Sequence, residues 1–255
     1  VHAPDEEVTP GVLSAVRTFT EKVETQFSDS IPNLRDGRRL ALASWLASPE
    51  NPLTTRSIVN RVWQHHFGTG IAGNPNNFGV MGKKPTHPAL LDWLTGYFLK
   101  NGWSIKQLHR LILNSEAYQR SSHHPYFDEI KDLDPDNKLL AYFSPRRLRA
   151  EELRDAMLKV SGELNLNMGG LPVRPEINRE VALQPRHIMG SIAPAYQPSP
   201  TPEERHRRSI YASQVRGLPN PMLEVFNKPN ADISCEGRIE STVTPQAFTL
   251  FNSQN

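Results

Sequence analysis

The feature that most constrains the fold of this chain is a series of five segments, all within residues 38–164, in which apolar side chains recur at helical spacing. Apolar residues at every third or fourth position form one stripe along a helix, and that stripe has to be buried against other elements. Pro, Gly or a capping residue bounds each segment, so the chain must turn between them. The sequence therefore predicts helices over residues 38–47, 54–67, 88–100, 104–114 and 144–164.

Two of the predicted helices have contrasting side-chain patterns. Residues 38–47 are apolar on nearly every side, which is typical of a buried helix. Residues 54–67 have a single apolar face, formed by Ile58, Val59, Val62, Trp63 and Phe67. The opposite face of this second helix is predicted to carry the polar side chains Asn60, Arg61, Gln64 and His65.

The clearest helix-start signal lies at Ser104. Ser104 and Gln107 have the spacing of a capping box, in which a hydroxyl and an amide satisfy two N–H groups that have no helical partner. Trp103 and Leu108 can add a hydrophobic staple across the same turn. Because Gly102 is a typical stop for the preceding helix, the sequence predicts a helical hairpin at this position.

The last third of the chain has a different sequence pattern. After Gly169-Gly170, Pro is frequent and the apolar periodicity is weak. Short strands are predicted near residues 181–183 and over 209–215, and short helices over 221–226 and 245–252. The predicted fold class is mainly α, an irregular helical domain with a small β element in the C-terminal third. We predict a linker over residues 1–36 and one domain over 37–255, with a helical core at 37–166 and an irregular part at 167–255.

Charge and cysteine content exclude several classes of protein. The net charge is only +2, whereas a nucleic-acid-binding protein usually carries a stronger or more clustered positive field. No run of about 18 apolar residues exists, so we expect no membrane insertion. Cys235 is the only cysteine, which rules out an internal disulfide framework and a C-x-x-C-H haem attachment. We therefore expect no cofactor in this chain.

Histidines and one aspartate are the candidates for metal binding or acid–base chemistry. His65 and His66 are adjacent, so on a helix their side chains diverge and cannot ligate one ion as an i, i+4 pair would. Either of them could still join His87, His109 or Asp92 in space to bind a metal ion, and His66 and His109 are the metal-ligand candidates. A buried, hydrogen-bonded His66 is the alternative. His65 is a catalytic candidate, together with His87 at a helix start and Asp92 one turn further on.

A dense charged stretch and a glycine pattern give two further candidates. Arg146, Arg147 and Arg149 are candidate anion-binding residues, because guanidinium groups match oxyanions bidentately. The alternative is a surface network of ion pairs with the acidic residues that follow them. Gly68-x-Gly70-x-x-Gly73 matches the dinucleotide-binding pattern, but it follows a helix instead of a strand, which favours a turn-rich loop.

Several sequence blocks resemble one known family. The blocks lie in order along the chain, and they are residues 40–68 (LALASWLASPENPLTTRSIVNRVWQHHFG), Asn77-Phe78-Gly79, Pro85-Thr86-His87-Pro88, Leu90-Leu91-Asp92-Trp93-Leu94, Gly102-Trp103-Ser104-Ile105-Lys106, residues 146–151 (RRLRAE), Met168-Gly169-Gly170, Arg207-Arg208-Ser209-Ile210-Tyr211 and Thr244-Pro245-Gln246-Ala247. Together they resemble the planctomycete cytochrome-c-associated C-terminal domain of unknown function. The resemblance covers nearly all of the chain from Gly37 onward.

The resemblance implies a context but no reaction. It implies a multidomain protein that begins with a cytochrome-c-like domain, a location outside the cytoplasm in the periplasm or at the cell surface, and haem only in that upstream domain. The neighbouring domain is then the expected partner. Our first hypothesis is a non-catalytic scaffold or interaction module. The alternative is a hydrolase that acts on an extracellular polymer such as a glycan through a pocket of His, Asp and Arg side chains.

Overall fold

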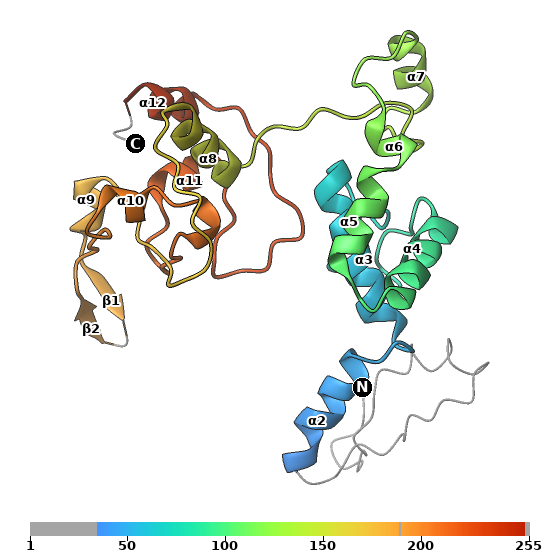
Figure 1. Ribbon diagram of the computed structural model, residues 1–255, viewed down its shortest axis with the longest axis horizontal. Coiled ribbons are helices and arrows are strands. Elements are labelled where there is room, and N and C mark those ends of the chain that lie inside the picture. The colour runs from blue at the N-terminus through green and yellow to red at the C-terminus, as the bar shows by residue number, and fades with distance from the viewer. Residues whose placement is uncertain (1–34, 189, 253–255) are drawn as a thin grey trace. The chain divides into compact units, whose positions relative to one another are not determined.

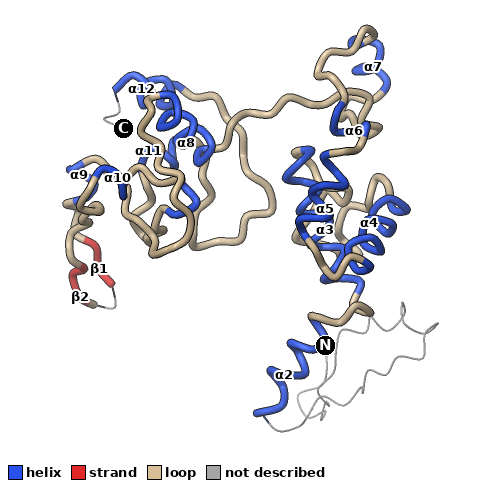
Figure 2. Tube along the Cα trace, viewed as in Figure 1, coloured by secondary structure: helices blue, strands red, loops and turns tan. Residues whose placement is uncertain are grey.

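The computed structural model describes residues 35–188 and 190–252 (Figures 1 and 2). These residues fall into two compact units, one up to Pro145 and the other from Arg146 onward. The predicted linker over residues 1–36 lies almost entirely outside the described residues.

The first unit is built from helices. They are α2 (Arg35–Leu46), α3 (Pro52–Phe67), α4 (Pro88–Lys100), α5 (Ile105–Leu113), α6 (Glu116–Gln119) and α7 (Phe127–Leu133). Helix α3 packs against both α4 and α5, and α4 packs against α5, which confirms the helical hairpin predicted around Gly102. Their inward side chains and one residue of the loop after α3, Ile71, form one core of buried residues: Val59, Val62, Trp63, Ile71, Leu91, Leu94, Phe98, Leu108 and Ile112.

Local capping interactions explain where the helices of this core begin. The Asn51 side chain accepts hydrogen bonds from two N–H groups in the first turn of α3, and Pro52 occupies the first helical position. Ser104 accepts a hydrogen bond from the Gln107 N–H at 3.3 Å and so begins α5 at the predicted residue. Gly68, which has a φ of +83°, ends α3 because glycine adopts this left-handed conformation without strain.

A buried asparagine joins α3 to the glycine-rich loop that follows it. The Asn60 side-chain amide donates to the Ala72 carbonyl at 3.0 Å, and its oxygen accepts from the Ala72 N–H at 2.8 Å. Asn60 is fully buried, so the prediction that it lies on the polar outer face of α3 was wrong. The residues after Gly68 form turns without a helix at Gly73, as the loop prediction requires.

Helix α2 differs from its prediction. It spans Arg35–Leu46, where the sequence predicts residues 38–47, and Leu40 is 72% exposed and Leu42 is 54% exposed. The prediction of a buried helix was therefore wrong. An apolar pattern shows which surface a helix can bury, but it does not specify the element that would cover that surface.

The second unit consists mainly of loops with short elements (Figure 2). The elements are α8 (Ala150–Val160), α9 (Arg179–Ala182), β1 (Arg186–Ile188), β2 (Ser191–Ala193), α10 (Pro202–Arg205), the 3-10 helix η1 (Ser209–Tyr211), α11 (Pro221–Val225) and α12 (Thr244–Asn252). Helix α8 packs against η1 and α11, and α11 packs against α12. Strands β1 and β2 pair antiparallel, with His187 opposite Ile192.

Three predicted elements of this unit have different bounds or types. Helix α8 begins at Ala150 instead of residue 144, because the Glu152 carboxylate accepts the Arg149 N–H and caps the helix there. The strand predicted near residues 181–183 is the end of α9. The segment 209–215, predicted as a strand, begins with the 3-10 helix η1 at Ser209–Tyr211, and beyond it makes only single bridges, such as Val173 with Ala212.

Two buried arginines organise the interior of the second unit. The Arg154 guanidinium donates to the carbonyls of Arg205 at 2.7 Å and Arg207 at 3.1 Å. The Arg207 guanidinium donates to three carbonyls of residues 167–171 and stacks on the Tyr211 ring at 4.1 Å. The sequence pattern places Leu153, Ala156, Met157, Val160 and Leu164 on one face of this helix, whereas the buried side chains of α8 are Ala150, Arg154 and Leu158.

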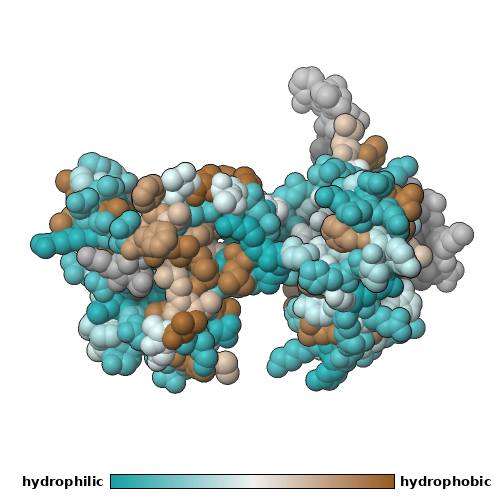
Figure 3. Space-filling view, turned by 90° about the horizontal axis from the view of Figure 1, so that it is seen from above, coloured by the Kyte–Doolittle hydropathy of each residue, from teal (hydrophilic) through white to brown (hydrophobic). Residues whose placement is uncertain are grey.

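The fold class agrees with the sequence prediction, because the described residues are mainly helical with one two-stranded sheet in the C-terminal third. Helix α8, which the sequence placed in the core at 37–166, packs within the second unit. None of the helices described is both long and apolar enough to cross a membrane. Apolar side chains also lie on the surface (Figure 3), and on α12 Phe248 is 63% and Phe251 is 86% exposed.

Candidate functional site

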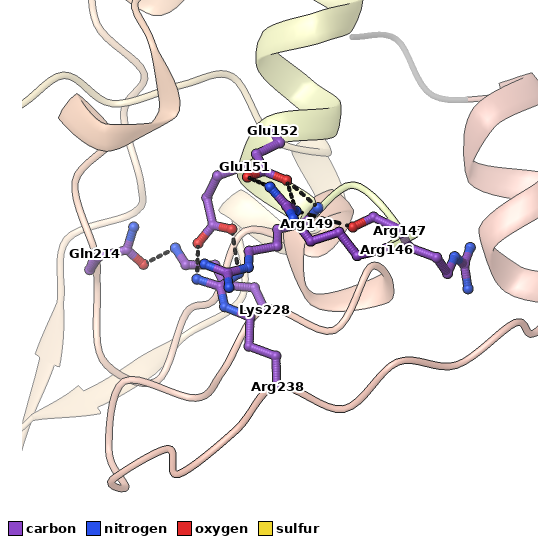
Figure 4. A network of polar contacts seen from close by, with 8 residues as sticks. All are labelled: Arg146, Arg147, Arg149, Glu151, Glu152, Gln214, Lys228 and Arg238. Atoms are coloured by element: carbon purple, nitrogen blue, oxygen red, sulfur yellow. Dashed lines mark hydrogen bonds and ion pairs between the residues drawn. The ribbon is translucent and has the colours of Figure 1, made fainter. Parts of the chain in front are cut away.

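A cluster of charged side chains lies at the start of α8 (Figure 4). It combines side chains of residues 146–152 with Lys228 and Arg238, which come from the segments on either side of Pro229–Gly237. The cluster is named here the cation cluster, and its members are Arg146, Arg147, Arg149, Glu151, Glu152, Lys228 and Arg238. It holds five cationic side chains against two carboxylates.

Glu152 is held on both of its carboxylate oxygens. Arg146 donates to them through two nitrogens, at 2.7 and 2.9 Å, and the backbone N–H of Arg149 donates to Oε2 at 2.9 Å. The Arg146 hydrogen bond lowers the pKa of Glu152 from its ordinary value, and the backbone hydrogen bond lowers it further against the opposing effect of burial. Glu152 therefore stays ionised and serves as the cap of α8.

Glu151 is paired in the same bidentate way with Arg238. The two guanidinium nitrogens lie 2.5 and 3.0 Å from the carboxylate oxygens. Burial raises the pKa of Glu151, but the hydrogen bonds and the positive charge of Arg238 outweigh that effect, so the pKa is lowered overall. This pair ties residue 238 to the first turn of α8 across 87 residues of sequence.

Arg149 and Lys228 lie in a part of the cluster where cationic side chains outnumber carboxylates. Burial lowers the pKa of Arg149, and the neighbouring cations Arg238 and Arg146 lower it further against the opposing effect of Glu152 and Glu151. Burial also lowers the pKa of Lys228, which has Glu151 as a favourable neighbour and Arg238 as an unfavourable one. An amine or guanidinium whose pKa is lowered by like charges is stabilised by any anion that approaches it.

Arg147 extends the cluster toward α12. Its guanidinium donates to the Ser241 carbonyl, to Thr242 Oγ1 at 2.9 Å and to Gln246 Oε1 at 3.4 Å. Gln246 is itself buried and donates to the carbonyls of Val225 and Ser241. The groups that Arg147 contacts within the described residues are thus neutral oxygen acceptors.

The structure brings together the three arginines that the sequence predicts as anion ligands, Arg146, Arg147 and Arg149. Arg146 fits the ion-pair alternative, because it pairs with Glu152, while Arg147 contacts neutral groups; anion binding by the three residues stays a prediction. Sequence reasoning missed Lys228 and Arg238. Neither residue lies in a motif, and only the tertiary fold carries them to α8.

We expect Glu152→Gln to lower the free energy of unfolding by about 1 kcal/mol at pH 7, because the variant weakens both the cap and the pair with Arg146. The pKa of Glu152 is lowered in the folded chain. Its contribution is therefore complete above the ordinary pKa of 4.5 and is lost as pH falls through the lower, folded value. Urea unfolding of the unmodified chain and the variant between pH 3 and 7 should give free energies of unfolding that converge at low pH. A difference in free energy that stays constant with pH would contradict this assignment.

The first unit contains a separate pair of candidate residues. His66 Nε2 on α3 and His109 Nδ1 on α5 lie 2.7 Å apart. The Tyr118 ring contacts the edge of His66 with the ring centroids 5.4 Å apart. Burial lowers the pKa of His66, and the neighbouring His109 and His65 lower it further. The structure therefore unites the two histidines that the sequence names as metal-ligand candidates.

The three catalytic candidates have different surroundings. His65 is exposed on α3. The His87 ring nitrogen Nδ1 lies 3.0 Å from Thr86 Oγ1, next to the start of α4. Asp92 forms an ion pair with Arg56, at 2.6 Å between Nη2 and Oδ1. Asp92 therefore stabilises a surface contact between α3 and α4.

Comparison with known proteins identifies a family for most of the chain. Residues 38–255 match the family model PSD1, described as a protein of unknown function (DUF1553). The comparisons with curated proteins and with solved structures found no match.

Proposed function

Because the chain belongs to the PSD1 family of unknown function (DUF1553), we propose a role from its own residues: an interaction module that binds an oxyanion-bearing partner through the cation cluster. The observation that carries this proposal is the excess of positive charge at the start of α8. The cluster places five cations around two carboxylates, and two of those cations have pKa values lowered by burial and by like charges.

The hydrogen bonds within the cluster favour binding over acid–base chemistry. A general acid or base needs a pKa near the working pH. Glu151 and Glu152 have lowered pKa values and accept bidentate hydrogen bonds from arginines, so both stay ionised and engaged. The hydrolase hypothesis draws less support, since Asp92 is paired with Arg56 and His87 lies beside Thr86.

The shared chemistry of the proposed ligand is a carboxylate or similar oxyanion, which guanidinium groups recognise bidentately. Two sources could present it, an acidic protein surface or an acidic polysaccharide. Poly-glutamate and polygalacturonate are suitable probes for the two sources, and dextran is the uncharged control. Affinity for either polyanion is expected to fall with added salt because exposed charges are screened.

We expect Arg149→Gln to weaken binding of the better polyanion by about tenfold, the loss of one charge-assisted contact. Arg149→Lys keeps the charge but loses the planar fork, so its loss should be smaller. Isothermal titration calorimetry at low ionic strength measures both.

The matched control is Lys159→Gln, because Lys159 is an exposed cation on the same helix and the variant has the same change in net charge. Equal losses for Arg149→Gln and Lys159→Gln would show only non-specific attraction and would contradict the proposal. Absence of binding to both polyanions would also contradict it.

The resemblance stated from the sequence supports two further parts of the proposal. We propose that the module acts outside the cytoplasm and that a cytochrome-c-like domain of the same polypeptide, which carries the haem, is its neighbour. An export signal and a C-x-x-C-H motif in the coding sequence upstream of Val1 would agree with this. A complete gene that encodes neither would contradict it.

A further inference from the structure

The histidine pair of the first unit has the geometry of a ligand site that is independent of the cation cluster. His66 is on α3 and His109 is on α5, and the two helices pack against each other in the core. Nε2 of one ring faces Nδ1 of the other at 2.7 Å, with the ring planes inclined at 72°. Two ring nitrogens from different helices therefore converge on one point in space.

The surroundings of the pair hold the His66 ring in position. Tyr118 packs edge-on against His66, and Phe67 packs edge-on against Tyr118. Tyr118 also contacts Phe143, with centroids 5.1 Å apart. Both histidines are partly buried, so one side of the pair is apolar while the other reaches the surface. An aromatic wall beside a pair of imidazoles limits the access of water to the nitrogens.

We propose that His66 and His109 form a two-imidazole site for a late first-row transition-metal ion, which replaces the hydrogen bond between them. Imidazole nitrogen is a preferred ligand of zinc, copper and nickel. Zinc–nitrogen bonds of about 2.0–2.1 Å at tetrahedral angles place two ligand nitrogens about 3.3 Å apart. The observed separation of 2.7 Å thus has to widen by roughly 0.6 Å, which small rotations of two side chains can supply.

The donor set determines what kind of metal site this is. Among the residues that the structure describes, no group of three or more His, Cys, Asp or Glu side chains is placed to hold an ion. The two imidazoles are then the protein ligands, and water completes the coordination. A closed structural zinc site has four protein ligands, so the site proposed here is open and exchangeable.

Zn²⁺ titrated into the whole chain at pH 7.5 is the test. Calorimetry is expected to show one ion bound, and NMR should show shifts of the ring protons of His66 and His109. We expect His109→Ala and His66→Ala each to weaken this binding by at least about tenfold. Circular dichroism shows whether each variant is folded. If His66→Ala does not fold, the test relies on His109→Ala.

The matched control is His123→Ala, which removes an exposed histidine from a loop of the same unit. Binding that persists in both ligand variants, or that falls equally in the control, would overturn the site and indicate adventitious binding elsewhere. Absence of Zn²⁺ binding to the unmodified chain would also overturn the metal site. His66 and His109 would then be interpreted only as a hydrogen-bonded pair. Because polyanion binding is measured on the other unit, either proposal can fail without the other.

Discussion

Arg154→Met is expected to lower the free energy of unfolding of the second unit by about 3 kcal/mol or more. The Arg154 side chain is 6% exposed and donates to two buried carbonyls and to Ser209 Oγ at 3.3 Å. Methionine fills a similar volume but donates no hydrogen bond. Each carbonyl left without a partner costs about 1–3 kcal/mol in desolvation, and these losses exceed the gain from removing a buried charge.

Hydrogen exchange with mass spectrometry measures this effect unit by unit. Peptides that contain α8 and residues 205–211 should lose protection, because Arg154 joins them directly. Peptides from α3, α4 and α5 should keep their protection. Lys159→Met is the control, since Lys159 is exposed one turn further along α8 and should change stability by less than about 0.5 kcal/mol. Equal protection in Arg154→Met and the unmodified chain would refute the structural role of Arg154.

Arg154 also shows why the sequence described the second unit less well than the first. In the first unit, Ser104, Gly68 and the leucines of α4 give local signals that specify the helix ends and the apolar faces. In the second unit, carbonyls of irregular loops are satisfied by guanidinium groups from distant residues. Apolar periodicity carries no information about such contacts, so it does not predict that Arg154 is among the buried residues of α8.

The candidate site was predictable only in its local part. Arg146, Arg147 and Arg149 are visible as a charged stretch next to Glu151 and Glu152. Lys228 and Arg238 lie far along the chain, and their contribution depends on the loop that returns them to α8. The histidine pair is similar, because the sequence offered His66 and His109 as candidates while the packing of α3 on α5 determines that they meet.

Asn60 shows most clearly where helical spacing fails to predict burial. Its position on α3 predicts a solvent-exposed side chain, but the side chain is buried against the loop that follows the helix. Its side-chain amide donates one hydrogen bond to the Ala72 carbonyl and accepts one from the Ala72 N–H. Those bonds hold Ile71 in the core, where it is 2% exposed. The glycine-rich loop places its backbone close to this amide, because a Cβ on Gly70 would lie 2.7 Å from Asn60 Nδ2.

We expect Asn60→Ala to lower the free energy of unfolding of the first unit by about 3 kcal/mol, because the N–H and carbonyl of Ala72 both remain buried without partners. Asn60→Asp keeps the acceptor but loses the donor and adds a buried charge, so it should cost at least as much. Asn77→Ala makes the same chemical change at an exposed position of the glycine-rich loop after α3, and it should lower the free energy of unfolding by about 1 kcal/mol or less. Urea unfolding followed by tryptophan fluorescence measures all three, because the four tryptophans of the chain all belong to the first unit. Equal stabilities for Asn60→Ala and Asn77→Ala would mean that the loop is held by other contacts, since Asn77→Ala removes only an exposed side-chain hydrogen bond, from the Gly79 N–H at 3.1 Å.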